Sequence, residues 1–410
     1  MRVLQLCHKS PYPAKDGGCL AILNISQGLL NAGIDLKILT IETHKHPFIK
    51  KLIPKDFIEK TNIESVFVDT SLNIVDAFSS LITQDSYNIS RFFSADFDFK
   101  LQEELEKNEY DIVHLESLFM TPYLNSIRAH SNARIVLRSH NLEFIIWKRL
   151  ARQSGNVAKR AYLNLLAHQL KNYELDILNQ VDGIAAISRR DAIDFEKLGS
   201  KKPKLIIPFG INLDVYTPVL NENPQLNFFH LGSMDWTPNI EGLNWFLDEI
   251  WPKINEVFPK SHFYLAGRDM PEDFYKRKSP NVHIVGEVED AKNFINSNSI
   301  MIVPLLSGGG IRVKIIEGMA LGKAIISTAV GAEGLHYKNK KNIWIANKVD
   351  DFIKAINYFN EDLQNINKMG LNARALAESD YNEKRIIEML ISFYEELLSK
   401  PIFNPGKITS

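Results

Sequence analysis

Residues 304–335 read PLLSGGGIRVKIIEGMALGKAIISTAVGAEGL, and this stretch decides the fold class. A short apolar strand leads into three glycines, a helix is predicted over 312–321, and a second apolar strand follows at 324–328. A strand, a helix and a second strand in this order form the unit from which parallel sheets are built, with helices on both faces. The stretch therefore predicts a parallel α/β domain.

Short apolar strands alternate with amphipathic helices along most of the remaining chain, in two series. The strands predicted in the first series are 3–7, 35–41, 111–115, 134–138, 183–187 and 204–207. The strands predicted in the second series are 227–231, 262–266, 282–285, 300–305 and 324–328, and a long helix is predicted at 239–257.

Two doubly wound, Rossmann-like domains follow from these two series. We expect the first domain to span 1–207 and the second 225–381, joined by a linker at 208–224 that is rich in Pro, Asn and Gly. Residues 382–399 have apolar side chains at helical spacing, and we expect 382–410 to return to the first domain. The predicted fold class is α/β, with two parallel sheets whose ligand-binding edges face each other across a cleft.

Bulk composition excludes several classes of function. The 410 residues carry 48 Lys and Arg against 49 Asp and Glu, so no overall field attracts nucleic acid. Two cysteines, Cys7 and Cys19, are too few for a disulfide framework and lack the spacing of a zinc site. No apolar run approaches the ~20 residues of a membrane span. We therefore expect a cytoplasmic protein that binds neither nucleic acid nor a metal.

The three glycines at 308–310 and the helix behind them predict an anion site. Glycines let the backbone approach a ligand, and the free N–H groups at a helix start favour phosphate oxygens. Arg312 and Lys314 place cations at this end, where they oppose the helix dipole, which a purely structural helix would avoid. A plain loop leading into a helix is the alternative. Gly17 and Gly18 before the first predicted helix make a similar but weaker case.

Several segments resemble one known family, the group 1, family 4 glycosyltransferases, which have the two-domain GT-B architecture. The resemblance implies retaining transfer of a sugar from a nucleotide-sugar, such as a UDP- or GDP-sugar, to a glycan or lipid-linked acceptor, with no metal required. The segments that carry it are PYPAKDGG at 11–18, DIVHLES at 111–117, RSHNLE at 138–143, IPFGINLD at 207–214, LGSMDWTPNIEGLNWFLDEIWP at 231–252 and SGGGIRVKIIEGMALGKAIIST at 307–328.

Site residues carry over from the family motifs position by position. Glu317 matches the second Glu of a paired-glutamate motif and is expected on the donor ribose, Gly18 on the diphosphate, and His140 facing the donor sugar. The resemblance thus implies His140 and Glu317 as catalytic residues. The expected donor-binding residues are Gly17, Gly18, Gly232, Ser233, Arg268, Ser307, Gly308, Gly309, Gly310, Ile311, Arg312, Lys314 and Glu317.

Two departures from the family pattern matter. Gly309 stands where the first Glu of the pair is expected, so contacts to the sugar hydroxyls either come from backbone N–H groups of the glycine loop or are absent. Ser233 and its neighbours stand where many relatives carry an Arg and a Lys that neutralise the diphosphate. We expect Arg312 and Lys314, together with Arg268, to supply the missing charge, because an active transferase must stabilise its leaving group.

The acceptor side is less defined. Glu116 follows a predicted strand, where it either faces the acceptor or orients a loop as a buried carboxylate. Residues 144–173 contain no Asp or Glu. This basic stretch either contacts an anionic partner, which would be a membrane surface or an anionic acceptor, or is a solvated helix face. Contact with a membrane would give the protein a peripheral location at the membrane. Its basic residues are Lys148, Arg149, Arg152, Lys159, Arg160 and Lys171.

Two rival functions share this architecture. A nucleotide-sugar epimerase would convert the donor without adding an acceptor. A non-catalytic protein, suggested by Gly309, would bind a nucleotide-sugar without transferring it. Arg312, Lys314, Glu317 and His140 together favour an enzyme.

Overall fold

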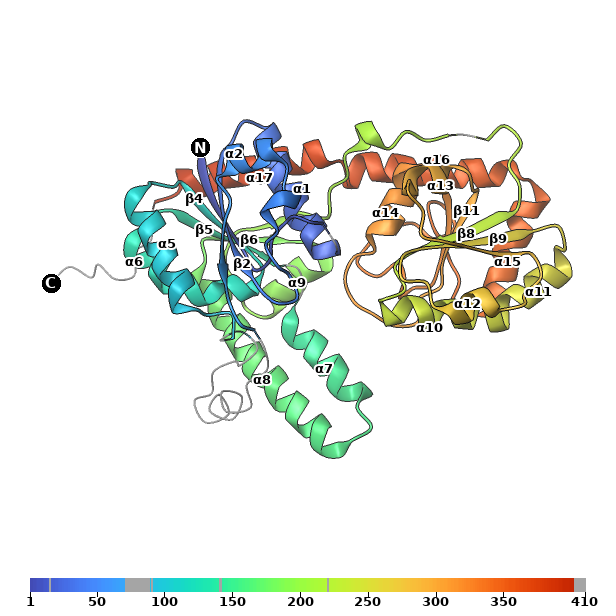
Figure 1. The fold of residues 1–410 in the computed structure, drawn as a ribbon, viewed down its shortest axis with the longest axis horizontal. Coiled ribbons are helices and arrows are strands. Elements are labelled where there is room, and N and C mark those ends of the chain that lie inside the picture. The colour runs from blue at the N-terminus through green and yellow to red at the C-terminus, as the bar shows by residue number, and fades with distance from the viewer. Residues whose placement is uncertain (15, 71–88, 90, 140–141, 220, 402–410) are drawn as a thin grey trace. The chain divides into compact units, whose positions relative to one another are not determined.

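The computed structural model describes residues 1–14, 16–70, 89, 91–139, 142–219 and 221–401. The chain divides into two compact units, each built on one parallel sheet (Figure 1). Unit 1 comprises Met1–Pro208 together with Lys384–Ser410, and unit 2 comprises Phe209–Glu383.

Unit 1 is a seven-stranded sheet in the order β3-β2-β1-β4-β5-β6-β7, with every neighbouring pair parallel. Its strands are β1 (Arg2–Cys7), β2 (Asp35–Glu42), β3 (Glu64–Phe67), β4 (Ile112–Glu116), β5 (Arg134–Ser139), β6 (Gly183–Ala186) and β7 (Lys204–Ile206). Its helices are α1 (Gly17–Asn31), α2 (Lys55–Thr61), α5 (Ala95–Lys107), α6 (Leu124–His130), α7 (Glu143–Gln153), α8 (Val157–Gln180), α9 (Arg189–Lys197) and α17 (Glu383–Ser399), with 3-10 turns at Lys50–Leu52 and Leu118–Tyr123.

Unit 2 is a six-stranded parallel sheet in the order β10-β9-β8-β11-β12-β13. Its strands are β8 (Asn227–Leu231), β9 (His262–Ala266), β10 (Val282–Gly286), β11 (Ile300–Val303), β12 (Ala324–Ser327) and β13 (Trp344–Ile345). Its helices are α10 (Thr237–Trp245), α11 (Trp251–Val257), α12 (Glu272–Lys276), α13 (Ala291–Asn296), α14 (Val313–Ala320), α15 (Val349–Glu361) and α16 (Gln364–Asp380), with a 3-10 turn at Leu213–Val215 and a π turn at Phe246–Ile250.

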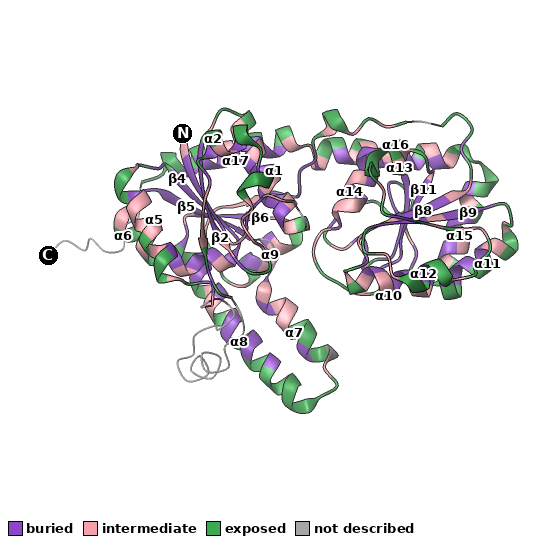
Figure 2. Cartoon of the chain, in the orientation of Figure 1, coloured by how far each residue is buried: buried purple, intermediate pink, exposed green. Residues whose placement is uncertain are grey.

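The central strands of both sheets are buried, because helices cover both faces (Figure 2). This confirms the α/β class, and both strand orders are of the Rossmann type. The single helix predicted at 239–257 is interrupted by the π turn before α11. Pro252 stands in the first turn of α11 and has no backbone N–H to donate, so the regular hydrogen-bond ladder cannot pass through it.

The C-terminal helix α17 packs in unit 1, as the sequence predicted. Its apolar face, including Leu390 and Phe393, belongs to the same core cluster as α1 and strand β1. Gly28 of α1 permits this packing, because a Cβ there would lie 2.4 Å from a side-chain carbon of Ile387. The two ends of the chain therefore share one hydrophobic core.

Helices α7 and α8 form a helical hairpin that extends away from the unit 1 sheet (Figure 1). Its far end is largely exposed (Figure 2). At its base, the Glu174 carboxylate accepts hydrogen bonds from the backbone N–H groups of Glu143 and Phe144, at 2.9 and 3.0 Å. Among the described residues, no helix combines the length and the apolar character needed to cross a membrane.

Candidate functional site: the start of helix α14

Strand β11 leads through the glycine loop to helix α14, whose N-cap residue is Arg312. No side chain among the described residues caps this helix start, and the N–H of Ile315 in its first turn donates to the carbonyl oxygen of Arg312. The Arg312 guanidinium donates from Nη1 to the carbonyl oxygens of Gly309 and Gly310, and lies 5.0 Å from the ring centre of Trp236. Arg312 is only 5% exposed, and within the described part of the chain its Nε and Nη2 have no hydrogen-bond partner.

Lys314, in the first turn of α14, is held by two neutral groups. Its Nζ lies 3.0 Å from the amide oxygen of Asn239 and 3.2 Å from Nε2 of His230. Burial, with a smaller contribution from the charge of Arg312, lowers the pKa of Lys314 to about 7. Gly232 lies against the ammonium, because a Cβ there would be 2.4 Å from Nζ.

The loops after β8 and β9 approach each other closely beside Lys314. Gly267 has φ +157°, and a Cβ on it would lie 1.7 Å from the carbonyl oxygen of Gly232, so no side chain fits. The Ser233 hydroxyl lies 3.5 Å from Asp269, and Met234 N donates to the carbonyl oxygen of Arg268. Two of the predicted donor-binding residues, Gly232 and Lys314, thus lie together at this edge of the sheet.

Glu317 lies one turn further along α14, on the helix that carries Lys314. Its Oε1 accepts a hydrogen bond from the Tyr216 hydroxyl at 2.9 Å. Burial raises the pKa of Glu317, although the Tyr216 bond and the charge of Lys314 act against this rise. Sequence reasoning missed Tyr216, which follows the segment IPFGINLD at the start of unit 2.

The glycine loop leaves space in front of α14. Nothing lies within 4 Å of a Cβ built on Gly309, whereas one on Gly308 would meet the Trp236 ring at 2.8 Å. The Ser307 hydroxyl donates to Glu241 at 2.5 Å. Ile311 is partly buried and close to Gly334. The position that lacks the expected glutamate is therefore open.

The glycine pair at the start of α1 has a different environment. Lys9 lies over Gly18 and donates to both oxygens of Asp16, at 2.8 and 3.0 Å. Asp16 also caps α1 by accepting from Cys19 N at 2.9 Å. Although burial acts to raise it, the pKa of Asp16 is lowered overall, chiefly by the hydrogen bond and charge of Lys9. Asp16 therefore neutralises the charge of Lys9 and also caps the start of α1, and both contacts lie within unit 1.

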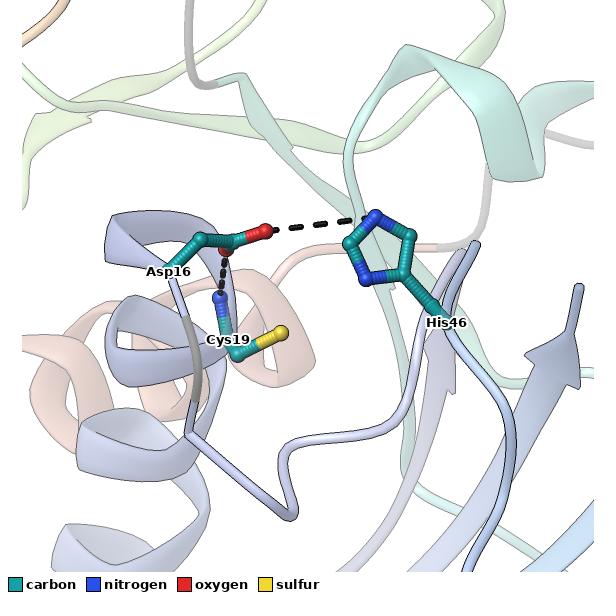
Figure 3. A group of neighbouring side chains, drawn as sticks. All are labelled: Asp16, Cys19 and His46. Atoms are coloured by element: carbon teal, nitrogen blue, oxygen red, sulfur yellow. Dashed lines mark hydrogen bonds and ion pairs between the residues drawn. The ribbon is translucent and has the colours of Figure 1, made fainter. Parts of the chain in front are cut away.

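Asp16, Cys19 and His46 come together at this helix start, in a grouping that the sequence did not reveal (Figure 3). Their potential ligand atoms lie within 4.8 Å of one another, which is close enough for a metal ion. However, Asp16 is already paired with Lys9, and burial raises the pKa of the Cys19 thiol to about 11. Both facts disfavour a cation here, because a metal requires a thiolate and would be repelled by the ammonium.

Glu116 is completely buried in unit 1, where its carboxylate binds Gln5 Nε2 at 2.9 Å and Arg138 Nη1 at 3.1 Å. Next to it, His114 Nδ1 lies 2.6 Å from the hydroxyl of Tyr394, which belongs to α17. These contacts favour the orienting role that the sequence left open for Glu116. The carboxylate neutralises a buried cation and belongs to the polar network that joins the sheet to α17.

The remaining predicted residues lie elsewhere. Lys148, Arg149 and Arg152 are exposed on α7 of the helical hairpin. His140 lies outside the described residues.

Comparisons with known proteins identify the family. A sequence model described as "Glycosyltransferase Family 4" matches residues 20–215, and one described as "Glycosyl transferases group 1" matches residues 225–362. Both units are thus covered. The chain belongs to the group 1, family 4 glycosyltransferases and has the GT-B architecture.

Individual relatives are distant. An uncharacterized 44.6 kDa protein in the cps region of Klebsiella pneumoniae is 22% identical over 402 residues, 95% of this chain and 98% of its own length. Sucrose-phosphate synthase from Thermosynechococcus elongatus has a TM-score of 0.68 at 16% identity, covering 97% of this chain and 100% of its own. Anabaena HepE, solved with UDP-glucose, has a TM-score of 0.63 at 14% identity, with 97% and 100% covered.

Proposed function

We propose that this protein is a retaining, metal-independent glycosyltransferase that binds a nucleotide-sugar at the start of α14 in unit 2. The observation that carries the proposal is the pair of cations there. Arg312 has two buried nitrogens, Nε and Nη2, with no hydrogen-bond partner among the described residues, and Lys314 is held by neutral groups. A diphosphate supplies the negative charge and the acceptor oxygens that these groups lack.

The chemistry follows from where charge develops. When the bond between the sugar and the diphosphate breaks, the leaving oxygen gains negative charge. Arg312, Lys314 and the first N–H groups of α14 are proposed to stabilise that charge, so that the protein itself would supply what a metal supplies elsewhere. Glu317, oriented by Tyr216, is proposed to bind the ribose, and His140 to face the donor sugar.

Gly309 decides how the sugar is held. Because the glutamate expected at this position is absent, the backbone of 307–311, together with Gly232 and Ser233, is proposed to contact the sugar and diphosphate. Arg268 completes the proposed donor set, whereas the helix start at Gly17 and Gly18 is compensated within unit 1 by Asp16 and Lys9. A nucleotide-sugar epimerase and a non-catalytic binding protein remain the rivals, and both would bind the donor.

Binding and turnover separate these functions. UDP-sugars and GDP-sugars are screened by thermal shift, since a ligand of the native state raises its melting temperature. The stabilising sugar is then incubated with glycan and lipid-linked acceptors, and the anomeric configuration of the product is read by NMR. We expect the product to retain the anomeric configuration of the donor sugar, and we expect EDTA to leave the rate of transfer unchanged. An epimerised free donor, binding without transfer, or an absolute need for Mg²⁺ or Mn²⁺ would each contradict the proposal.

Unit 1 is proposed to bind the acceptor, with the helical hairpin resting on anionic lipid when that acceptor is lipid-linked. The basic side chains of 148–160 share the hairpin with exposed apolar residues, including Leu150 at 45% and Val157 at 77%. Cations with neighbouring exposed apolar groups suit a membrane surface.

Vesicle sedimentation tests this placement. Anionic phosphatidylglycerol vesicles should pull the protein down at low salt and release it at high salt, because surface charges are screened. The double variant Lys148→Gln/Arg152→Gln should sediment less, and the exposed control Lys341→Gln of unit 2 should not change. If the protein sediments equally with neutral phosphatidylcholine vesicles, or with neither kind of vesicle, the membrane proposal is wrong. The basic stretch is then a solvated helix face.

A further inference from the structure

A buried histidine lies behind the cation of Lys314. His230 belongs to β8 and is fully buried, in the middle of a parallel sheet where an apolar side chain would be expected. Its Nδ1 lies 2.8 Å from the carbonyl oxygen of Ile302 in the neighbouring strand β11. Its Nε2 faces Lys314 at 3.2 Å. The imidazole therefore links the sheet to the helix that carries the proposed donor site.

The Ile302 carbonyl fixes the state of this ring. A carbonyl oxygen can only accept, so Nδ1 must carry the hydrogen and donate it. In the neutral ring, Nε2 then has a lone pair directed at the Lys314 ammonium. Burial, aided by the charge of Lys314, lowers the pKa of His230 well below its ordinary value, so the ring stays neutral.

The groups around Lys314 come from three elements. His230 of β8 and Asn239 of α10 both present neutral acceptors. On its own segment, Arg312 lowers the pKa of Lys314 and Glu317 raises it, while burial contributes the largest lowering. The two neutral acceptors are thus the direct hydrogen-bond partners that hold the ammonium beside Gly232.

We propose that His230 is a positioning residue whose Nε2 lone pair fixes the position and the charge of the Lys314 ammonium at the diphosphate site. This inference rests on the proposed function for its role in donor binding, although the pairing of His230 with Lys314 is independent of any ligand. A hydrocarbon side chain at residue 230 would leave one ammonium N–H without an acceptor, which favours the uncharged amine.

A pH dependence of donor binding follows. With a pKa of about 7 in the free protein, Lys314 is charged below neutral pH and loses its charge above it. A diphosphate binds the charged form, so affinity should be greatest below pH ~7 and fall by up to about tenfold per pH unit above it. Without His230, the same fall should begin at lower pH.

The test titrates Lys314 in the ligand-free protein by NMR of ¹³Cε-labelled lysine, with Lys314→Arg identifying the signal. His230→Phe should lower the pKa of Lys314 by about one to two pH units, and His230→Gln, which keeps an acceptor, should lower it less. Lys323 is the internal control, because burial lowers its pKa to about 8 and its Nζ binds the Asn296 carbonyl, not His230. An unchanged Lys314, or an equal shift of Lys323, overturns the inference.

A second measurement needs no substitution. The ¹⁵N spectrum of the wild-type imidazole should show the neutral Nδ1–H tautomer of His230 at a pH where an exposed histidine is already protonated. An Nε2–H tautomer or an imidazolium at that pH would overturn the inference even if His230→Phe fails to fold. UDP-glucose affinity, measured between pH ~6 and ~8.5, tests the donor role separately. If Lys314 titrates as expected but Lys314→Ala leaves UDP-glucose affinity unchanged, the pairing of His230 with Lys314 is supported. The proposed phosphate site is then wrong.

Discussion

The starts of α1 and α14 are alike in sequence and opposite in electrostatics. Each follows a strand of a parallel sheet, has glycines close by, and brings a lysine near the first helical turn. At α1, Asp16 neutralises Lys9 and caps the helix. At α14, the N-cap is Arg312, and the hydrogen-bond partners of Lys314 among the described residues, His230 and Asn239, are both neutral.

This difference favours the start of α14 over that of α1 as the anion site that we propose. Burying a cation away from a directly bonded counter-charge costs free energy, and the lowered pKa of Lys314 reflects that cost. A bound anion would offset the cost. The α1 start meets its own electrostatic requirement, and the α14 start does not. Four experiments can break or sharpen this contrast.

The largest expected effect is on diphosphate binding. Arg312→Ala and Lys314→Ala should each weaken UDP binding by about 10- to 150-fold, since each removes a charged hydrogen bond worth roughly 1.5–3 kcal/mol. Calorimetric titration measures the change. Lys9→Ala is the matched control and should have little effect, because Asp16 already neutralises Lys9. If Lys9→Ala weakened UDP binding as much as the α14 variants do, the two helix starts would not differ in anion binding. The same conclusion would follow if both α14 variants kept full UDP affinity and native circular dichroism spectra.

Nucleoside recognition should depend on Glu317 and not on the cations. Glu317→Ala should weaken binding of uridine, which has no phosphate, by about tenfold, whereas Lys314→Ala should leave uridine affinity nearly unchanged. Tyr216→Phe should have a smaller effect in the same direction, because it removes the hydrogen bond that orients the carboxylate. Titration with uridine decides this. If Lys314→Ala weakened uridine binding as much as Glu317→Ala does, the nucleoside and diphosphate subsites would not be distinct.

Removing the N-cap side chain should cost more stability at α1 than at α14. Asp16→Ala should lower the free energy of unfolding by about 0.5–2 kcal/mol through loss of the cap, because Asp16 bonds Cys19 N. Asp16→Asn should keep the capping contribution but lose the charge pairing with Lys9. Arg312→Ala should cost less, since no side chain caps α14. Urea denaturation compares the three variants. A loss at Arg312 as large as that at Asp16 would show a structural role for the α14 cation.

The smallest expected effect is on acid stability. The pKa of folded Asp16 lies below its ordinary value, so its contribution is present above the unfolded pKa and is lost as pH falls through the folded pKa. Unfolding free energies of wild type and Asp16→Asn, measured between pH ~5 and ~2, should therefore converge as the pH falls. A constant difference across this range would mean that the carboxylate charge is not what stabilises the α1 start.

The sequence predicted the architecture well, because its signals are local. Strand and helix patterns are periodic within single elements, and Gly33, with φ +79°, ends α1 in the left-handed conformation expected of a glycine after a helix. The α7 and α8 hairpin was not predicted as such. Its basic residues were visible, but nothing local showed that two successive helices would leave the sheet together.

The candidate site was predicted only in part. Arg312, Lys314 and Glu317 stand close together in one motif, so the sequence alone could group them. Tyr216, His230 and Asn239 could not be grouped with them, because each comes from a different segment and meets α14 only after the sheet has formed.

By itself, the sequence determined the two parallel α/β series, the family and the identity of the α14 cations, because periodicity and motif spacing are written along the chain. Tertiary structure alone decided which charges are compensated. Gly17 and Gly18 resemble the α14 loop in sequence, but packing places Lys9 beside Asp16 in one unit and Lys314 beside His230 in the other. The physical reason is that charge compensation depends on distances in space and on burial, which only the folded chain defines.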